Sequence, residues 1–200
     1  MSEVRSRMDT LGVASLLESE LLDVLFGGES GDGQALQQAV LQQRMSQAPI
    51  DPELWRRLQA WEALKLRWWE GAMRREPLLN SGMVQAYLTQ RIGGLRCEQI
   101  LALYLDSRLH LVDSQVLSVG TVNEARLYPR ELVRGAIENS ATHLVLAHNH
   151  PSGQQRPSAA DLGLTQHVES ILAGVNITLV DHFVVTALGI ESIKHSNKAA

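Results

Sequence analysis

The sequence predicts an α/β protein in which a three-layer domain around a single sheet follows a small helical region. Two observations predict this class. Apolar residues recur at helical spacing over residues 1–95, whereas short β-type apolar runs alternate with helical segments over residues 96–200. Strands and helices that interleave in this way suit one sheet covered by helices. We therefore divide the chain into a helical region, 1–95, and an α/β domain, 96–200.

Four helices are predicted in the first region. They cover residues 11–26, 34–44, 51–75 and 81–93. The third begins at Asp51-Pro52-Glu53, which offers an N-cap, a proline at the first helical position and a first-turn acid. The fourth begins with Ser81 as its cap. The third helix carries all four tryptophans, which we expect to be core anchors: Trp55, Trp61, Trp68 and Trp69.

The second region alternates strands with helices. Strands are predicted over residues 99–105, 109–119, 142–147 and 176–186, and helices over 129–139 and 158–172. A short turn at Asp106-Ser107-Arg108 joins the first two strands, and Pro129 suits the first position of a helix. Gly174 ends the second helix. Residues 196–200 form a loose polar tail in this prediction.

One short window concentrates metal-binding side chains. His148 and His150 follow a buried strand, where residues two apart point to the same side. Ser158 and Asp161 then stand at the N-cap and third position of the next helix, which returns Asp161 to the histidines. Two imidazoles and a carboxylate are the ligands of a catalytic zinc, and they leave one position for water. The same Ser-x-x-Asp spacing also fits a capping box, which alone could explain Ser158 and Asp161.

This window resembles the JAMM signature of the JAB1/MPN metalloprotease superfamily. The longer run Ala147-His148-Asn149-His150-Pro151-Ser152-Gly153, with Asp181-His182 downstream, resembles its bacterial RadC branch. The resemblance covers about residues 96–195. It implies a three-layer JAMM/MPN-like (cytidine-deaminase-like) domain and a zinc hydrolase. Carried over residue by residue, the resemblance implies that His148, His150 and Asp161 are the zinc ligands. It also implies that Ser158 helps to stabilise the developing oxyanion.

The family's general base is a glutamate upstream of this window, and the sequence offers two candidates. Glu98 precedes the first strand, whereas Glu131 lies in the first turn of a helix, where an acid also complements the helix dipole. We favour Glu98, because a base must reach the attacking water. Asp181 is a candidate partner for the second ring nitrogen of a ligand histidine, or a polar break in its strand. Asn149 is expected to face outward.

The first region resembles the helix-hairpin-helix units of the RadC family only in degenerate form. Such units bind phosphate through a Gly-x-Gly hairpin, whereas residues 58–65 contain no glycine. The net charge is −4, and the basic residues between 56 and 75 are diluted by glutamates, as on a solvated helix face. DNA binding by this region is therefore doubtful, and a scaffold or partner-docking role is the other option.

The sequence therefore favours a zinc-dependent metalloprotease that cleaves a peptide or isopeptide-like amide bond of an unknown protein or peptide substrate. The alternative is an accessory protein of DNA repair or replication with a structural or vestigial metal site. The single cysteine, Cys97, excludes an internal disulfide and suits a reducing compartment. Without a signal-peptide or transmembrane run, we expect a cytoplasmic protein that is not bound to a membrane.

Overall fold

A computed structural model describes residues 24, 52–78, 81–120 and 127–196. The chain divides into two compact units, Met1–Leu64 and Lys65–Ala200. The helices predicted over 11–26 and 34–44 lie outside the described residues, except for Val24, which is helical. No helix of the described part is long and apolar enough to span a bilayer.

The later helices of the first region are confirmed. Helix α4 covers Pro52–Met73 and α5 covers Ser81–Leu88, and a π-helical turn, η2, follows over Thr89–Gly93. The tryptophan prediction holds only in part: Trp69 packs against the core, whereas Trp68 is 62% exposed. Neighbouring residues point about 100° apart on a helix, so both rings cannot face the same core.

The second unit is built on a five-stranded sheet in the order β2-β1-β3-β4-β5. Its strands are β1 (Gln99–Leu105), β2 (Leu111–Val119), β3 (His143–Asn149), β4 (Thr178–Thr186) and β5 (Gly189–Ser192). Only β3 and β4 are parallel, and the other neighbours are antiparallel. All four predicted strands are therefore confirmed. β5 was not predicted, because four half-buried residues give too short a pattern.

The turn between β1 and β2 is longer than predicted, and β2 starts at Leu111. The Asp106 carboxylate accepts hydrogen bonds from the amides of Arg108 and His110, at 2.8 and 2.9 Å. Leu109 adopts a φ of 65°, in the left-handed region. The side-chain bonds of Asp106 thus hold two more residues in the turn than the apolar pattern suggested.

Three further helices follow: α6 (Pro129–Glu138), α7 (Ala159–Ala173) and the short α8 (Ile193–Ser196). Helices α6 and α7 confirm the predicted segments. α8 and β5 occupy a stretch that the sequence analysis left without structure. Ser192, at the end of β5, pairs with Phe183 of β4, so the last described part of the chain joins the sheet.

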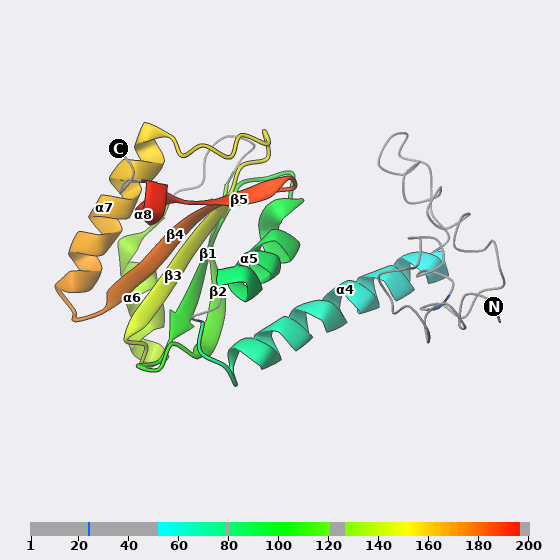
Figure 1. The fold of residues 1–200 in the computed structure, drawn as a ribbon, viewed down its shortest axis with the longest axis horizontal. Helices are drawn as coiled ribbons and strands as arrows, with labels where there is room; N and C mark the ends of the chain where they lie inside the picture. The colour runs from blue at the N-terminus through cyan, green and yellow to red at the C-terminus, as the bar shows by residue number, and fades with distance from the viewer. Residues whose placement is uncertain (1–23, 25–51, 79–80, 121–126, 197–200) are drawn as a thin grey trace. The chain divides into compact units, whose positions relative to one another are not determined.

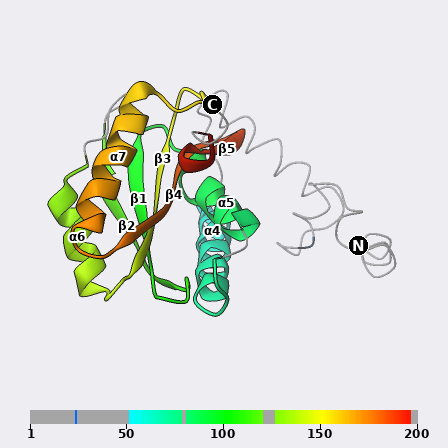
Figure 2. The same ribbon diagram turned by 60° about the vertical axis from the view of Figure 1, so that its left-hand side comes forward.

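The helices cover both faces of the sheet (Figure 1), and the turned view separates α6 and α7 on one face from α5 on the other (Figure 2). The alternating residues of β1 enter two distinct cores. Leu101 and Leu103 pack in the core that includes α5, whereas Ile100 and Ala102 pack in the core that includes α6 and α7. The three-layer prediction is confirmed, because both faces of the sheet are buried under helices.

The unit that contains the sheet begins before the first strand. It starts at Lys65, so it includes α5 and the last turns of α4. Met73 and Tyr87, which are 0% exposed, contribute to the core on this face. These helices are thus one layer of the α/β unit, whose first strand begins at Gln99. The predicted division into domains at residue 96 stays a prediction.

Candidate metal centre

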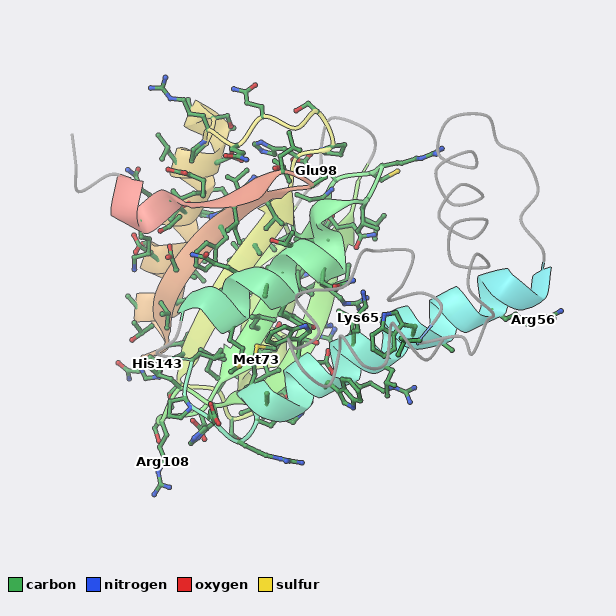
Figure 3. All side chains as sticks on the ribbon, turned by 45° about the vertical axis from the view of Figure 1, so that its right-hand side comes forward. Arg56, Lys65, Met73, Glu98, Arg108 and His143 are labelled. Carbon is green, nitrogen blue, oxygen red and sulfur yellow. The ribbon has the colours of Figure 1, made fainter. Side chains whose placement is uncertain are left out.

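The candidate site lies where β3 ends and β1 begins. These strands run antiparallel, with His148 opposite Ile100 and His143 opposite Leu105. Glu98, one residue before β1, is therefore brought to the carboxyl end of β3. Figure 3 shows Glu98 and His143 at opposite ends of the sheet. Fifty residues of chain thus separate two groups that the sheet places side by side.

His148, His150 and Asp161 converge on one point, as the sequence predicted. The Nε2 atoms of the two histidines lie 3.0 Å apart. Asp161 approaches with Oδ1 at 3.0 Å from His148 Nε2 and with Oδ2 at 3.6 Å from His150 Nε2. Ligand atoms about 2.0–2.2 Å from a tetrahedral zinc ion lie roughly 3.3 Å from one another. The donor set and its spacing therefore fit a zinc ion.

The position of the ring proton on His150 also fits a cation at this point. Its Nδ1 lies 2.8 Å from the carbonyl oxygen of Gln154, which can only accept a hydrogen bond. Nδ1 therefore carries the proton, and in the neutral ring Nε2 presents a lone pair toward the Asp161 carboxylate. Two facing acceptors repel each other unless a cation lies between them.

Asp161 is also held by the start of α7. Its Oδ2 accepts hydrogen bonds from the Ser158 amide at 2.7 Å and the Ser158 hydroxyl at 2.6 Å. The Asp161 amide in turn donates to Ser158 Oγ at 3.2 Å, which completes a capping box. The capping interpretation of these residues is thus correct, and it is compatible with ligation because Oδ1 faces His148.

The electrostatics of this carboxylate favour its charged form. Burial, the largest single influence, raises the pKa of Asp161, but its close contact with the His148 ring and its hydrogen bonds from Ser158 together outweigh it. The net effect is a pKa well below the ordinary value for aspartate. Asp161 is therefore ionised, as a metal ligand must be.

Glu98 joins His148 and His150 in a group of side chains that could hold a metal ion, called the metal-binding cluster below. One ligand atom each from Glu98, His148 and His150 lie within 4.8 Å of one another. The Glu98 carbonyl also accepts a hydrogen bond from the Gly120 amide at 2.8 Å, which anchors this residue to the end of β2. Its carboxylate is thus close enough to act either as a fourth ligand or as a base beside the metal.

The prediction that Asn149 faces outward was wrong. Asn149 is 0% exposed. Its Oδ1 accepts a hydrogen bond from the Gln99 amide at 2.7 Å, and its Nδ2 donates to the Cys97 carbonyl at 3.1 Å. These bonds bracket Glu98 in the chain. The residue between the two histidines therefore ties the segment that carries Glu98 to the end of β3.

Glu131, the other candidate base, has different surroundings. Its carboxylate lies 2.6 Å from Arg134 Nη2 and 3.4 Å from Arg130 Nε, on the exposed side of α6. The hydrogen bond from Arg134 lowers the pKa of Glu131. Among the described residues, the metal-binding cluster contains Glu98 and not Glu131.

His182 is a site residue to which the sequence analysis gave no role of its own, although it stands in the Asp181-His182 pair that resembles the RadC branch. Its Nε2 lies 2.9 Å from His148 Nδ1, and its Nδ1 lies 2.7 Å from Thr165 Oγ1. Burial, reinforced by the neighbouring His148, lowers the pKa of His182 to about 3. The preceding residue, Asp181, accepts a hydrogen bond from Ser192 Oγ at 2.7 Å. The contact to His148 Nδ1 that was considered for Asp181 thus comes from the next residue of β4.

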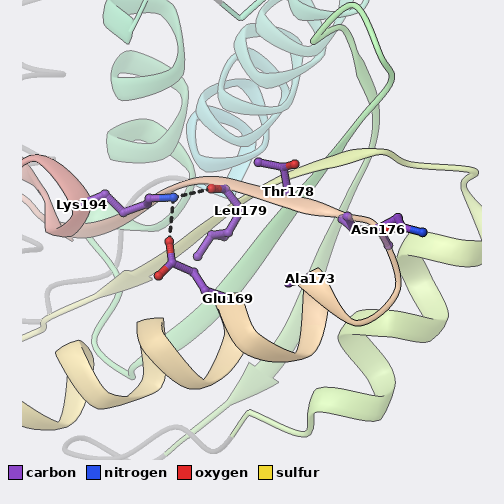
Figure 4. Close-up of a pocket in the computed structure, with 7 residues that line it drawn as sticks. Glu169, Ala173, Asn176, Thr178, Leu179 and Lys194 are labelled. Atoms are coloured by element: carbon purple, nitrogen blue, oxygen red, sulfur yellow. Dashed lines mark hydrogen bonds and ion pairs between the residues drawn. The ribbon is translucent and has the colours of Figure 1, made fainter.

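A shallow hollow of about 420 Å³ lies elsewhere, between α7, the start of β4 and α8 (Figure 4). Its two charged residues are paired with each other, with Lys194 Nζ 2.7 Å from Glu169 Oε1. Lys194 also donates to the Leu179 carbonyl at 2.6 Å. Both interactions tie α8 to its neighbours, so this hollow has a structural explanation and none of the residues of the metal-binding cluster.

The comparisons with known proteins agree with this geometry. The model of the RadC-like JAB domain family matches residues 78–198. UPF0758 protein Bpet3149 of Bordetella petrii is 45% identical over 116 residues, which are 58% of this chain and 52% of that protein. UPF0758 protein PSHAa2643 of Pseudoalteromonas translucida is 40% identical over 129 residues, 64% of this chain and 58% of that protein.

These relatives extend the resemblance without naming an activity. UPF0758 protein Smlt0399 of Stenotrophomonas maltophilia is 44% identical over 106 residues, 53% of this chain and 45% of that protein. The chain thus spans about half the length of the curated relatives it matches. The matched segment contains the whole sheet and every residue of the metal-binding cluster. The chain therefore belongs to the RadC family, within the JAB/MPN superfamily.

Proposed function

We propose that this chain is a zinc-dependent hydrolase of the metalloprotease type, which cleaves a peptide or isopeptide-like amide bond in a protein or peptide substrate. The observation that carries the proposal is the convergence of His148 Nε2, His150 Nε2 and the Asp161 carboxylate at 3.0 to 3.6 Å. These three residues would hold the ion. Bound zinc supplies a Lewis acid for the scissile carbonyl and lowers the pKa of water to about 7.

Glu98 is the proposed general base. Its carboxylate lies within the same 4.8 Å cluster as the histidines, so it can accept a proton from the attacking water. The protonated Glu98 can then donate that proton to the leaving amine. Asn149 supports this role because it bonds both neighbours of Glu98 and limits the movement of the segment.

Ser158 is proposed to stabilise the oxyanion of the tetrahedral intermediate. Its hydroxyl now donates to Asp161 Oδ2 at 2.6 Å, so it must rotate to donate to the substrate. The Ser158 amide keeps its own bond to Asp161, which holds the cap while the hydroxyl turns. Removal of one donor to an oxyanion costs about 10²–10³-fold in rate in well-studied cases.

The cysteine content bears on the compartment in which the chain works. The single Cys97 cannot form an internal disulfide and is a free thiol. This composition suits a reducing compartment, and we propose a cytoplasmic location on that basis.

Zinc binding and hydrolysis are tested separately. Purified chain should contain about one zinc ion, and His148→Ala should lose it. Glu98→Gln should keep the ion and lose hydrolysis of a fluorogenic peptide-amide library by at least about 10²-fold. Glu131→Gln is the matched control and should keep both properties. Hydrolysis by Glu98→Gln at the unmodified rate would show that Glu98 is not the base, and a wild-type chain without zinc would refute the metal centre.

A further inference from the structure

A chain of three hydrogen bonds runs behind the metal-binding cluster. The Thr165 hydroxyl donates to the Asp161 carbonyl at 2.7 Å, and Thr165 Oγ1 lies 2.7 Å from His182 Nδ1. His182 Nε2 then lies 2.9 Å from His148 Nδ1. The chain thus starts at the backbone of one proposed ligand, crosses from α7 to β4, and ends on the ring of another.

The direction of each bond can be worked out from the proton count. The single proton of Thr165 is donated to the Asp161 carbonyl, so Thr165 Oγ1 must accept from His182 Nδ1. His182 is 0% exposed, and a neutral imidazole that donates from Nδ1 can only accept at Nε2. Its Nε2 is then an acceptor, and His148 must donate from Nδ1.

We propose that Thr165 and His182 are positioning residues, which hold His148 in the tautomer whose Nε2 lone pair faces His150 and Asp161. This inference rests on the proposed metal centre. The opposite tautomer would place a proton on His148 Nε2, the atom that lies 3.0 Å from both partners. A protonated nitrogen cannot bind a metal ion. The hydrogen-bond chain from Thr165 through His182 to His148, called the relay below, therefore selects the tautomer of His148 that can bind.

A bulge in β4 aims His182 at this ring. Leu144 pairs with Leu179 and Val145 pairs with Asp181, so Val180 has no partner in β3. Leu179 packs in the core under α6 and α7, whereas Phe183 packs in the opposite core. In a regular strand these residues, four apart, would share a face. The extra residue therefore shifts the alternation and turns His182 toward His148.

The relay can be distinguished from a general packing role, because it needs a hydrogen-bond acceptor at each of two positions. His182→Leu keeps much of the volume but cannot accept from His148, and Thr165→Val cannot accept from His182. His182→Gln restores an acceptor near the position of Nε2, and Thr165→Ser restores the hydroxyl. His167, exposed on the same helix as Thr165, offers a matched control in His167→Leu.

The experiment measures zinc affinity by competition with a chromophoric chelator, with the fold of each variant checked by circular dichroism. We expect about 10–100-fold weaker binding for His182→Leu and Thr165→Val, in line with outer partners of metal ligands. His182→Gln, Thr165→Ser and His167→Leu should bind close to wild type. Equal affinity of wild type and His182→Leu would overturn the proposal.

A second measurement needs no variant. In metal-free wild-type protein with ¹⁵N-labelled histidines, NMR correlations should show the proton of His148 on Nδ1. A proton on Nε2 would refute the relay even if zinc binds. Conversely, failure of wild type to bind zinc would refute the metal centre, while the tautomer would still be read independently. The two hypotheses can therefore fail separately.

Discussion

Helices α6 and α7 pack against the same face of the sheet and each carries an acid at its third position, yet only one acid joins the site. In α6 the acid is Glu131, whose partners are the exposed Arg130 and Arg134. In α7 it is Asp161, whose partners are the buried end of β3 and its own N-cap, Ser158. Position in a helix alone therefore does not create a ligand.

The difference lies in what the sheet presents to each helix start. Helix α7 begins where β3 ends, so His148 and His150 face its first turn. Helix α6 begins after β2, at the edge of the sheet, and its first-turn acid stays half-exposed. The helix dipole favours both carboxylates, but it contributes only about 0.3–1 kcal/mol at such sites. What distinguishes Asp161 is that His148 and His150 converge on its carboxylate, an arrangement that suits a cation.

The strongest test of this comparison exchanges each acid for its amide. Asp161→Asn keeps an oxygen to accept the Ser158 amide, so the cap survives while the charge is lost. We expect zinc affinity to fall by more than about 100-fold, since even changes to outer partners cost about 10–100-fold. Glu131→Gln should leave it unchanged. Equal effects of the two variants in a chelator competition would show that the helix position, and not the site, determines binding.

The second test measures how the stability of the fold changes as the pH is lowered. His182 titrates at about 3 in the folded protein, facing His148, His150 and Asp161, whereas an unfolded histidine titrates near 6.5. Between these values the unfolded chain binds a proton that the folded chain does not. The stability from the neutral ring is thus complete above pH about 6.5 and is lost as the pH falls toward 3.

This linkage can be measured in metal-free protein by urea denaturation. From pH 6.5 to 4.5 the free energy of unfolding should fall by about 2 kcal/mol through this group. His182→Gln should flatten the dependence in this window, and Glu131→Gln should not. A profile that is the same in His182→Gln and wild type would mean that other groups dominate acid unfolding.

Most of the fold and the convergence of the candidate site residues could be predicted from the sequence, for physical reasons that differ. Strand β1 was predictable because both its faces are buried and its apolar run is unbroken. The convergence of His148, His150 and Asp161 was predictable because they lie within one strand–turn–helix unit, whose geometry is local. The proximity of Glu98 needed antiparallel pairing of β1 with β3, and the family resemblance supplied what periodicity could not.

The other features of the site depend on contacts between distant parts of the chain, which the spacing of residues in the sequence does not predict. The contact of His182 with His148 could not be predicted, because the orientation of His182 is set by a bulge at Val180 that no residue type marks. The orientation of Asn149 was missed because the backbone groups it binds lie about fifty residues away. The predicted role of Ser158 in catalysis stays a prediction, since its hydroxyl is used in the cap.

A third test compares the glycines of the two helices. A Cβ on Gly135 of α6 would overlap the Tyr104 hydroxyl, whereas a Cβ on Gly163 of α7 would have nothing within 4 Å. Gly135→Ala should therefore lower the free energy of unfolding by about 1–3 kcal/mol through overpacking. Gly163→Ala should raise it by about 0.5–1 kcal/mol through helix propensity. Chemical denaturation measures both, and a neutral Gly135→Ala would show that α6 can shift away from the sheet.

The smallest effect concerns the caps. Ser158 caps α7 with its side chain, whereas Tyr128, the N-cap of α6, makes no side-chain cap bond although its φ of −98° and ψ of 107° suit one. Tyr128→Ser should supply a cap worth about 1 kcal/mol. It also removes the stacking of Arg130, 5.7 Å from the ring, which is worth about 0.5 kcal/mol on a surface. The net gain of about 0.5 kcal/mol should appear in urea denaturation.

The outcome discriminates between two accounts of α6. If Tyr128→Ser stabilises the protein while zinc affinity stays unchanged, α6 is a structural helix whose start is free to be optimised. If the substitution instead weakens zinc binding, the start of α6 is coupled to the site, and the contrast with α7 would be one of degree. Because Tyr128 is 55% exposed and Glu131 is paired with arginines, we expect the first result.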